Sequence, residues 1–342
     1  MKQIFTYKKP FTLESGQTLS EYHLAYHTLG KMNAAKDNVV WIFHALTANS
    51  DPSEWWPGLV GEGKFFDPEQ YFIVCANIPG SCYGSLSPFD INPANGQPYY
   101  RDFPMFTPRD IIRTFQPLRE HLGIENIHVG IGGSLGGQQL LEWAIEEPTL
   151  FKNIVPIATN AVHSAWAIAF NASQRMCIEQ DSTWQEKSPT AGSKGMKIAR
   201  SIALISYRNY NTYVATQTGA TPETINNSID KQAYKAETYQ HYQGEKLVNR
   251  FNAFSYYLLS RTIDSHNVGR GRHSCEVALA SIKARTLVIS ISSDLLFPPC
   301  EQNYLATHIP NAQLITIDSL YGHDGFLLEF EKTETLLKSF LG

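Results

Sequence analysis

The sequence has few cysteines, no long apolar run and no surplus of positive charge. Its 342 residues include five cysteines, and none of them has the C-x-x-C spacing of a zinc site or redox pair. No apolar run approaches the ~18 residues that a membrane-spanning helix needs. Lys and Arg number 28 against 32 Asp and Glu, giving a net charge of −4. This balance argues against nucleic acid or an anionic membrane as a partner.

The N-terminal stretch Met1–Pro10 lacks the apolar segment of a secretory signal. We therefore expect a cytoplasmic protein with reduced thiols and without bound metal. Hydrophobic residues make up 43% of the chain and charged residues 18%. These proportions are typical of a folded globular protein and exclude a disordered or fibrous one.

Six short β-rich segments are apolar at both odd and even positions. Such segments suit strands buried on both faces of a parallel sheet. Helical patterns at 108–122, 137–147 and 325–340 lie between or after them, and this alternation predicts an α/β fold with a mostly parallel, doubly wound sheet. The expected strands are Val39–His44, Tyr71–Asn77, Ile127–Gly132, Ile154–Ala158, Thr286–Ser292 and Gln313–Asp318.

The alternation fails between the fourth and fifth strands, where long segments have helical patterns only. We expect residues 161–283 to form a helical insertion, and residues 1–160 and 284–342 to form the α/β core. An insertion at this point would lie over the carboxyl ends of the strands, where open α/β sheets bind ligands, and would act as a lid. The stretch Tyr7–His27 predicts a meander of antiparallel strands at the sheet edge.

The segment GGSLGG, residues 132–137, ends one expected strand and opens a helix. This G-x-S-x-G pattern is typical of a nucleophile elbow, whose strained turn lifts a serine out of the sheet. Glycine-rich turns also occur in nucleotide-binding folds, but the chain has neither G-x-G-x-x-G after its first buried strand nor G-K-[ST]. We therefore predict that Ser134 is a nucleophile.

A nucleophilic serine needs a base and an orienting carboxylate, in the chain order Ser, Asp or Glu, His for this fold. Asp294 directly follows one expected strand and His323 follows the next. A turn aspartate and a surface histidine are the alternatives for each residue taken alone. Their joint order and placement predict the triad Ser134, Asp294 and His323.

The oxyanion hole of such a site takes one backbone N–H from the residue after the serine, here Leu135. A second N–H comes from the loop after an earlier strand. That loop is HALT, and Leu46 is the expected donor, with Thr47 as the alternative. His44 is better explained as a brace for this loop than as a second base.

Together with further segments, these motifs resemble the homoserine O-acetyltransferase family over nearly the whole chain. The resemblance includes the insertion, which ordinary esterases would not share motif by motif. It implies an α/β-hydrolase fold that moves an acetyl group from acetyl-CoA to the hydroxyl of L-homoserine, in methionine biosynthesis, as a homodimer formed through the lid. The matching segments are FHALT, NIPGSCYGS, GGSLGGQQLLEWA, IATNA, AFN, GMKIARSIALISYR, SSDLLFPP and YGHDGFL.

The resemblance also implies roles for single residues. The triad and oxyanion-hole residues named above match those of the family. Arg200, in GMKIAR, is implied to hold the homoserine carboxylate, and Asp324 its amino group. A cationic and an anionic partner are what an amino acid requires. Acetyl-CoA is expected as a co-substrate in a ping-pong reaction, without a bound cofactor.

The chain departs from the family pattern at Leu135, where methionine is common, in HALTAN, where glycine commonly follows the threonine, and at Leu86–Asp90. Relatives with the same skeleton use succinyl-CoA or acylate serine. An O-succinyltransferase, a plain esterase or thioesterase of the same fold, and a non-catalytic binding protein are therefore the alternatives. The last would be expected to lose a triad residue, and all three are present.

Overall fold

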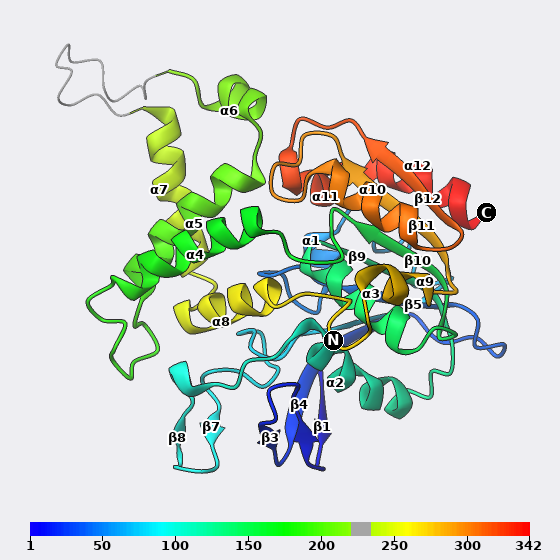
Figure 1. Cartoon of the computed structure of the whole chain (residues 1–342), viewed down its shortest axis with the longest axis horizontal. Helices are drawn as coiled ribbons and strands as arrows, with labels where there is room; N and C mark the ends of the chain where they lie inside the picture. The colour runs from blue at the N-terminus through cyan, green and yellow to red at the C-terminus, as the bar shows by residue number, and fades with distance from the viewer. Residues whose placement is uncertain (220–233) are drawn as a thin grey trace.

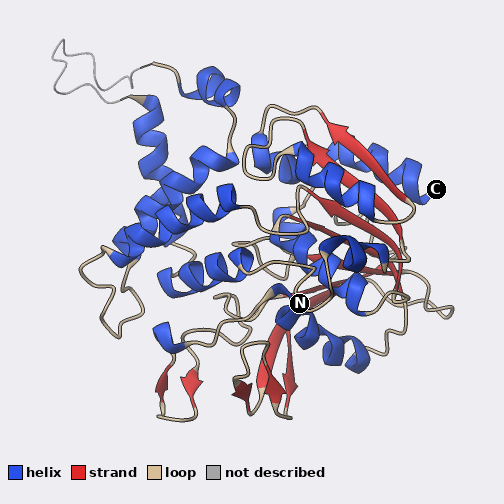
Figure 2. Cartoon of the chain, in the orientation of Figure 1, coloured by secondary structure: helices blue, strands red, loops and turns tan. Residues whose placement is uncertain are grey.

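The computed structural model describes residues 1–219 and 234–342 and is built around one eight-stranded sheet (Figures 1 and 2). The strand order is β1-β4-β6-β5-β9-β10-β11-β12, and the six strands from β6 to β12 in this order are parallel. The mostly parallel, doubly wound sheet is confirmed. Its strands are β1 (Gln3–Tyr7), β4 (Tyr22–Leu29), β5 (Val39–Phe43), β6 (Phe72–Ala76), β9 (Ile127–Gly133), β10 (Phe151–Ile157), β11 (Arg285–Ile291) and β12 (Ala312–Ile317).

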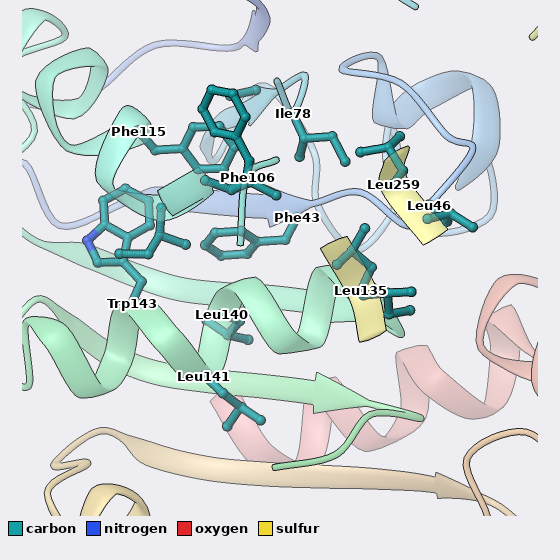
Figure 3. Close-up of a cluster of buried hydrophobic side chains, with 14 of the residues drawn as sticks. Phe43, Leu46, Ile78, Phe106, Phe115, Leu135, Leu140, Leu141, Trp143 and Leu259 are labelled. Carbon is teal, nitrogen blue, oxygen red and sulfur yellow. The ribbon is translucent and has the colours of Figure 1, made fainter. Parts of the chain in front are cut away.

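The parallel strands are apolar at both odd and even positions because each face of the sheet packs against its own hydrophobic core. In β5, Trp41 and Phe43 join a cluster with Phe115 and Trp143, part of which Figure 3 shows. Val40 and Ile42 of the same strand belong to a second cluster on the opposite face. Helices must therefore cover the sheet on both sides.

The helices of the core follow from local signals. Thr107 and Asp110 form a reciprocal capping box at the start of α2 (Pro108–His121). The helix expected from 137 begins two residues earlier, as α3 (Leu135–Glu146). The single helix expected over 325–340 is wrong: Glu329, at φ −84° and ψ 56°, separates α11 (Gly325–Leu328) from α12 (Phe330–Leu341). The remaining short elements are β2 (Phe11–Thr12), β3 (Thr18–Leu19), α1 (Pro52–Trp55), β7 (Ile91–Asn92), β8 (Gln97–Pro98), η1 (Tyr100–Asp102), α10 (Pro299–His308) and η4 (Gly322–Asp324).

The N-terminal edge is antiparallel, as expected, but only in part. β4 pairs with both β1 and β6, with Gln3 opposite Tyr26 at the outer edge. The intervening β2 and β3 form a separate two-stranded sheet, because a tight turn at Leu13–Gly16 folds the chain back on itself. The continuous meander expected over residues 7–27 is therefore wrong.

The chain between β10 and β11 forms helices, and α4, α5 and α7 stand to one side of the sheet (Figure 1). α9 differs from the others, because it packs against α3 and α10 beside the sheet. Residues 220–233 of the expected insertion lie outside the described residues. The helices are α4 (Ala165–Glu179), α5 (Ser193–Tyr207), α6 (Tyr210–Gln217), α7 (Lys235–Val248), α8 (Ala253–Asp264) and α9 (Cys275–Ala280).

The two ends of this helical segment are joined by backbone hydrogen bonds. Val268 N–H donates to Ala161 O at 2.9 Å, and His163 N–H donates to His266 O at 3.1 Å. The chain thus leaves the end of β10 and returns beside the same point. Among the described residues, no helix combines the length and the apolar character needed to cross a membrane.

Candidate active site

Ser134 lies at the sharp turn between β9 and α3, and its backbone is strained. Its φ of 57° and ψ of −126° are unusual for a residue with a side chain. The turn is possible because α3 approaches β5 closely at Gly136, where a Cβ would lie 2.2 Å from Phe43 O. The glycine pattern in the sequence therefore has a steric cause.

His323 and Asp294 are paired behind the serine. His323 Nδ1 lies 2.7 Å from Asp294 Oδ2, and Asp294 Oδ1 accepts backbone N–H groups from Leu296 at 2.9 Å and Phe297 at 2.8 Å. The Phe297 ring stacks on the imidazole at 4.9 Å. Both partners are buried. The Asp294 carboxylate holds the imidazole at Nδ1 and the Phe297 ring packs against its face, so the orientation of the ring is fixed.

The electrostatics of the pair favour a charged imidazole. Burial by itself would lower the pKa of His323, but the charge and hydrogen bond of Asp294 outweigh it, and the pKa is raised above its ordinary value. The nearby carboxyl groups of Asp324 and Glu301 add to this rise. Because a carboxylate only accepts hydrogen bonds, Nδ1 carries the proton and Nε2 of the neutral ring is left as the base.

Ser134 and His323 line one pocket of about 480 Å³, together with Leu46, Arg200 and Asp324. Within the described part of the chain, Ser134 Oγ forms no hydrogen bond with His323. Contacts of this kind often tighten only when substrate is bound. The pocket thus collects most of the expected site residues, while Asp294 lies behind the imidazole.

The expected oxyanion-hole donors flank the serine. Leu135 is the first residue of α3, so its N–H has no partner inside the helix and lies at the positive end of the helix dipole. Leu46 lies in a tight turn closed by a hydrogen bond from Ala48 N–H to Ala45 O at 3.1 Å. Across residues 1–219 and 234–342, the N–H groups of Leu46, Thr47 and Leu135 have no acceptor. Figure 3 shows the side chains of Leu46 and Leu135 at this edge of the core.

His44 is the brace of that turn. It is fully buried, its Nδ1 lies 2.9 Å from Ala45 O, and its Nε2 accepts from Ile78 N–H at 3.0 Å. Both ring nitrogens are thus used by backbone groups. Burial lowers the pKa of His44 to about 4, so the ring is neutral at neutral pH.

Arg200 and Asp324 face the pocket from different elements and have different partners. Arg200, on α5, lies over the Tyr207 ring, with Cζ 5.4 Å from the ring centroid. Among the described residues it forms no salt bridge. Asp324 follows His323 and pairs with Arg208, with Oδ2 and Nη1 3.0 Å apart. Asp324 is therefore already held by a guanidinium.

The end of α5 packs closely against η4, which contains His323, and Gly322 makes this contact possible. Its φ is +61°, and a Cβ there would lie 2.8 Å from Tyr207 O. Only glycine lets the end of α5 approach η4 this closely. The contact places Tyr207 in the pocket wall beside His323.

Sequence reasoning missed four pocket or near-pocket residues: Tyr83, Tyr207, Arg208 and Arg250. A signal existed for Tyr207, because it lies seven residues after Arg200 and therefore on the same face of α5. No local pattern identifies Arg250, which reaches the pocket from the connection between α7 and α8. Among the described residues, no three His, Cys, Asp or Glu side chains are grouped so as to hold a metal ion.

The elbow, the paired His and Asp and the parallel sheet define an alpha/beta hydrolase. In agreement, residues 38–330 match the model of the alpha/beta hydrolase fold family. The chain is also 49% identical over 339 residues to a homoserine O-acetyltransferase of Cyclobacterium marinum, covering 99% of this chain and 95% of that protein. It therefore belongs to the homoserine O-acetyltransferase family.

Solved structures agree on the fold. The crystal structure of a homoserine O-acetyltransferase from Bacillus anthracis has a TM-score of 0.89 at 24% identity, covering 100% of this chain and 97% of that one. An acetylester hydrolase from Corynebacterium glutamicum has a TM-score of 0.85 at 20% identity, covering 100% and 96%. Because proteins named as transferase and as hydrolase share this architecture, the fold alone does not define the fate of the acyl group.

Proposed function

We propose that this protein transfers an acetyl group from acetyl-CoA to the hydroxyl of L-homoserine, giving O-acetyl-L-homoserine for methionine biosynthesis. The observation that carries the proposal is the 49% identity to a homoserine O-acetyltransferase over 99% of the chain. The pocket supports it, because Ser134, His323 and Arg200 all line its wall. In the described part of the chain, Arg200 has no carboxylate partner.

In the first half-reaction, Ser134 Oγ attacks the thioester carbonyl carbon of acetyl-CoA while His323 Nε2 takes the hydroxyl proton. The N–H groups of Leu46 and Leu135 stabilise the tetrahedral oxyanion. The C–S bond then breaks, His323 returns the proton to the leaving thiolate, and CoA departs. Asp294 holds the imidazole and stabilises its charged form.

In the second half-reaction, His323 takes the proton of the homoserine hydroxyl, whose oxygen attacks the carbonyl carbon of the acetyl-Ser134 ester. The ester bond to Ser134 then breaks, and His323 returns the proton to Ser134 Oγ. Arg200 would bind the substrate carboxylate, and its lack of a salt bridge in the described part of the chain leaves it free for a bidentate contact. Asp324 would bind the amine. Because Arg208 already holds one of its oxygens, we expect the amine to use the other.

The lid, expected over residues 161–283, would exclude water from the acyl-enzyme. We propose that the lid also forms a homodimer. α4 and α5 pack against each other and expose large apolar side chains, among them Met176 at 61%, Ile198 at 55% and Ile205 at 56%. Exposed apolar side chains on adjacent helices are typical of an interface. The reaction would take place in the cytoplasm, where acetyl-CoA is available.

The nucleophile is tested with acetyl-CoA alone. Wild type should release about one equivalent of CoA per site in a burst and carry an acetyl group on Ser134, seen by intact-mass measurement. Ser134→Ala should lose both signals while keeping the wild-type fold. Absence of the adduct on wild type, together with sequential kinetics, would exclude the covalent mechanism.

The acyl fate and substrates are tested by crossing acetyl-CoA and succinyl-CoA with homoserine and serine. Acetyl transfer to homoserine should dominate. Preference for succinyl-CoA or serine would reassign the substrate within the same mechanism. Hydrolysis that homoserine does not divert would identify an esterase or thioesterase instead.

A further inference from the structure

Arg250 extends from the connection between α7 and α8 to the loop that follows β5. Its Nη1 donates to Thr47 O at 2.6 Å and to the Tyr83 hydroxyl at 2.9 Å, and its Nη2 donates to Thr47 Oγ1 at 3.2 Å. The three residues line the pocket that contains Ser134. One guanidinium thus joins the helical segment to two loops at the carboxyl ends of β5 and β6.

The backbone of Arg250 is held in place by its neighbours. Arg250 N–H donates to Leu247 O at 3.0 Å, at the end of α7. The next residue, Phe251, is 5% exposed and packs edge-on against Tyr83, with the rings 5.7 Å apart. The guanidinium therefore meets Thr47 from a fixed backbone.

The charge of Arg250 is directed at neutral oxygens. Within the described ranges, 1–219 and 234–342, it forms no salt bridge. A charged donor makes a stronger hydrogen bond to a carbonyl than a neutral donor does. The contact at Thr47 O is short, at 2.6 Å, and it acts on the peptide group one residue beyond Leu46.

The turn Ala45–Ala48 is consequently held at both ends. On the core side, His44 contacts Ala45 O at 2.9 Å, and Gln139 Nε2 donates to His44 O at 3.2 Å. On the side of the helices, Arg250 holds Thr47 through both its carbonyl and its hydroxyl. The Leu46 N–H lies between these two anchors.

We infer that Arg250 is a positioning residue for the oxyanion hole, holding the turn that presents the Leu46 N–H. The inference rests on the proposed acyl-enzyme mechanism. An oxyanion donor acts only when it is placed at hydrogen-bond distance from the developing charge. Releasing Thr47 would let the turn relax, and both half-reactions would slow because both pass through a tetrahedral oxyanion.

The first test compares Arg250→Met with Arg261→Met. Arg261 is an exposed arginine of α8 whose side chain forms no hydrogen bond in the described part of the chain, so its replacement controls for lost charge. Arg250→Met should slow acetylation of Ser134 about 10- to 100-fold. This is less than the roughly 10²- to 10³-fold loss from removing an oxyanion donor, because the Leu46 N–H is displaced and not removed. The loss should be equal for acetyl-CoA and for p-nitrophenyl acetate, which has no CoA portion. Deacetylation by homoserine should slow equally, with the homoserine KM within about twofold of wild type.

Two further variants separate positioning from general stability. Arg250→Lys, which keeps one donor toward Thr47 O, should recover part of the rate. Thr47→Val should cost only several-fold, and adding it to Arg250→Met should cause no further loss, because both changes act on the same contact.

Three outcomes would overturn the inference. Slower acetylation by acetyl-CoA alone would assign Arg250 to CoA binding, and a changed homoserine KM alone would assign it to the acceptor site. Rates equal to those of Arg261→Met, with or without a lower melting temperature, would leave Arg250 no part in the oxyanion hole. Failure of the proposed function differs from all three, because it would show in wild type itself, either as absence of acetyl-Ser134 or as hydrolysis of acetyl-Ser134 that homoserine does not divert.

Discussion

The two walls of the pocket are built differently. On the sheet side, Ser134, Asp294 and His323 follow strand ends and are 6%, 4% and 4% exposed, each held by neighbouring groups. On the helical side, Arg200 is less buried and, in the described part of the chain, has no ionic partner. Under the proposed function, the sheet side would carry the triad that both half-reactions need, and Arg200 on the helical side would bind the carboxylate of the acceptor. We therefore expect a change at Arg200 to affect the acceptor and to leave the acetylation of Ser134 intact.

The strongest test of this difference between the two sides of the pocket is Asp294→Asn, which alters the triad on the sheet side. An amide N–H facing His323 Nδ1 would favour the wrong imidazole tautomer, with the proton on Nε2. We expect both half-reactions to slow about 10³- to 10⁴-fold. Single-turnover rates with acetyl-CoA and then with homoserine measure this loss. A variant within tenfold of wild type in either step would contradict the assigned role.

Arg200→Ala changes only the helical side of the pocket. Removing the partner of a desolvated carboxylate should raise the homoserine KM and lower kcat/KM on the order of 10²-fold, corresponding to roughly 2.7 kcal/mol. The acetyl-CoA burst contains no amino acid and should stay close to wild type. Loss of the burst would show that Arg200 serves the triad or the CoA site.

Asp324→Asn is the companion change on the loop beside His323. It removes charge with little change in volume and should also lower kcat/KM for homoserine on the order of 10²-fold. Arg208 loses its carboxylate partner in this variant. Arg208→Ala therefore serves as the matched control, because it breaks the same pair while keeping the Asp324 charge. Normal homoserine turnover in Asp324→Asn would place the amine site elsewhere.

His44→Gln probes the stability of the sheet side. The folded-state pKa of His44, about 4, lies below the ~6.5 of an unfolded histidine. Between these values the unfolded chain binds the proton and the folded chain does not, so His44 costs roughly 1.4 kcal/mol of stability per pH unit as pH falls. His44→Gln keeps an acceptor for Ile78 N–H without titrating. Its melting temperature should fall less than that of wild type between about pH 7 and pH 5, and an equal fall would contradict the assignment.

The smallest effect is expected at Glu301, on α10, which accepts from Asn160 Nδ2 at 2.9 Å. Burial raises the pKa of Glu301 to about 7. From about pH 4.5 to pH 7 the unfolded chain loses this proton while the folded chain keeps it, so wild type loses stability as pH rises. Glu301→Gln should match wild type near pH 4.5 and melt roughly 1–3 °C higher near pH 8. A lower melting temperature at pH 8 would contradict this result.

Much of the sheet side was predictable from the sequence because its constraints are local. The elbow needs small residues within a few positions of Ser134, and the strands are apolar at both parities because both faces are buried. The contacts of the helical side are not local. Arg250 and Thr47 lie 203 positions apart, and an exposed arginine has no pattern that names its partner. The pairing of Arg208 with Asp324 is hidden for the same reason.

The hydrogen bonds between 161–163 and 266–268 have a consequence for how this architecture can change. Because both ends of the helical segment meet at one point, its length is decoupled from the spacing of β10 and β11. Helices can be lengthened, shortened or exchanged as a cassette, and the strands on either side keep their register. We expect a chimaera joined at these two positions to take Ser134 and Asp324 from one parent and Arg200 from the other.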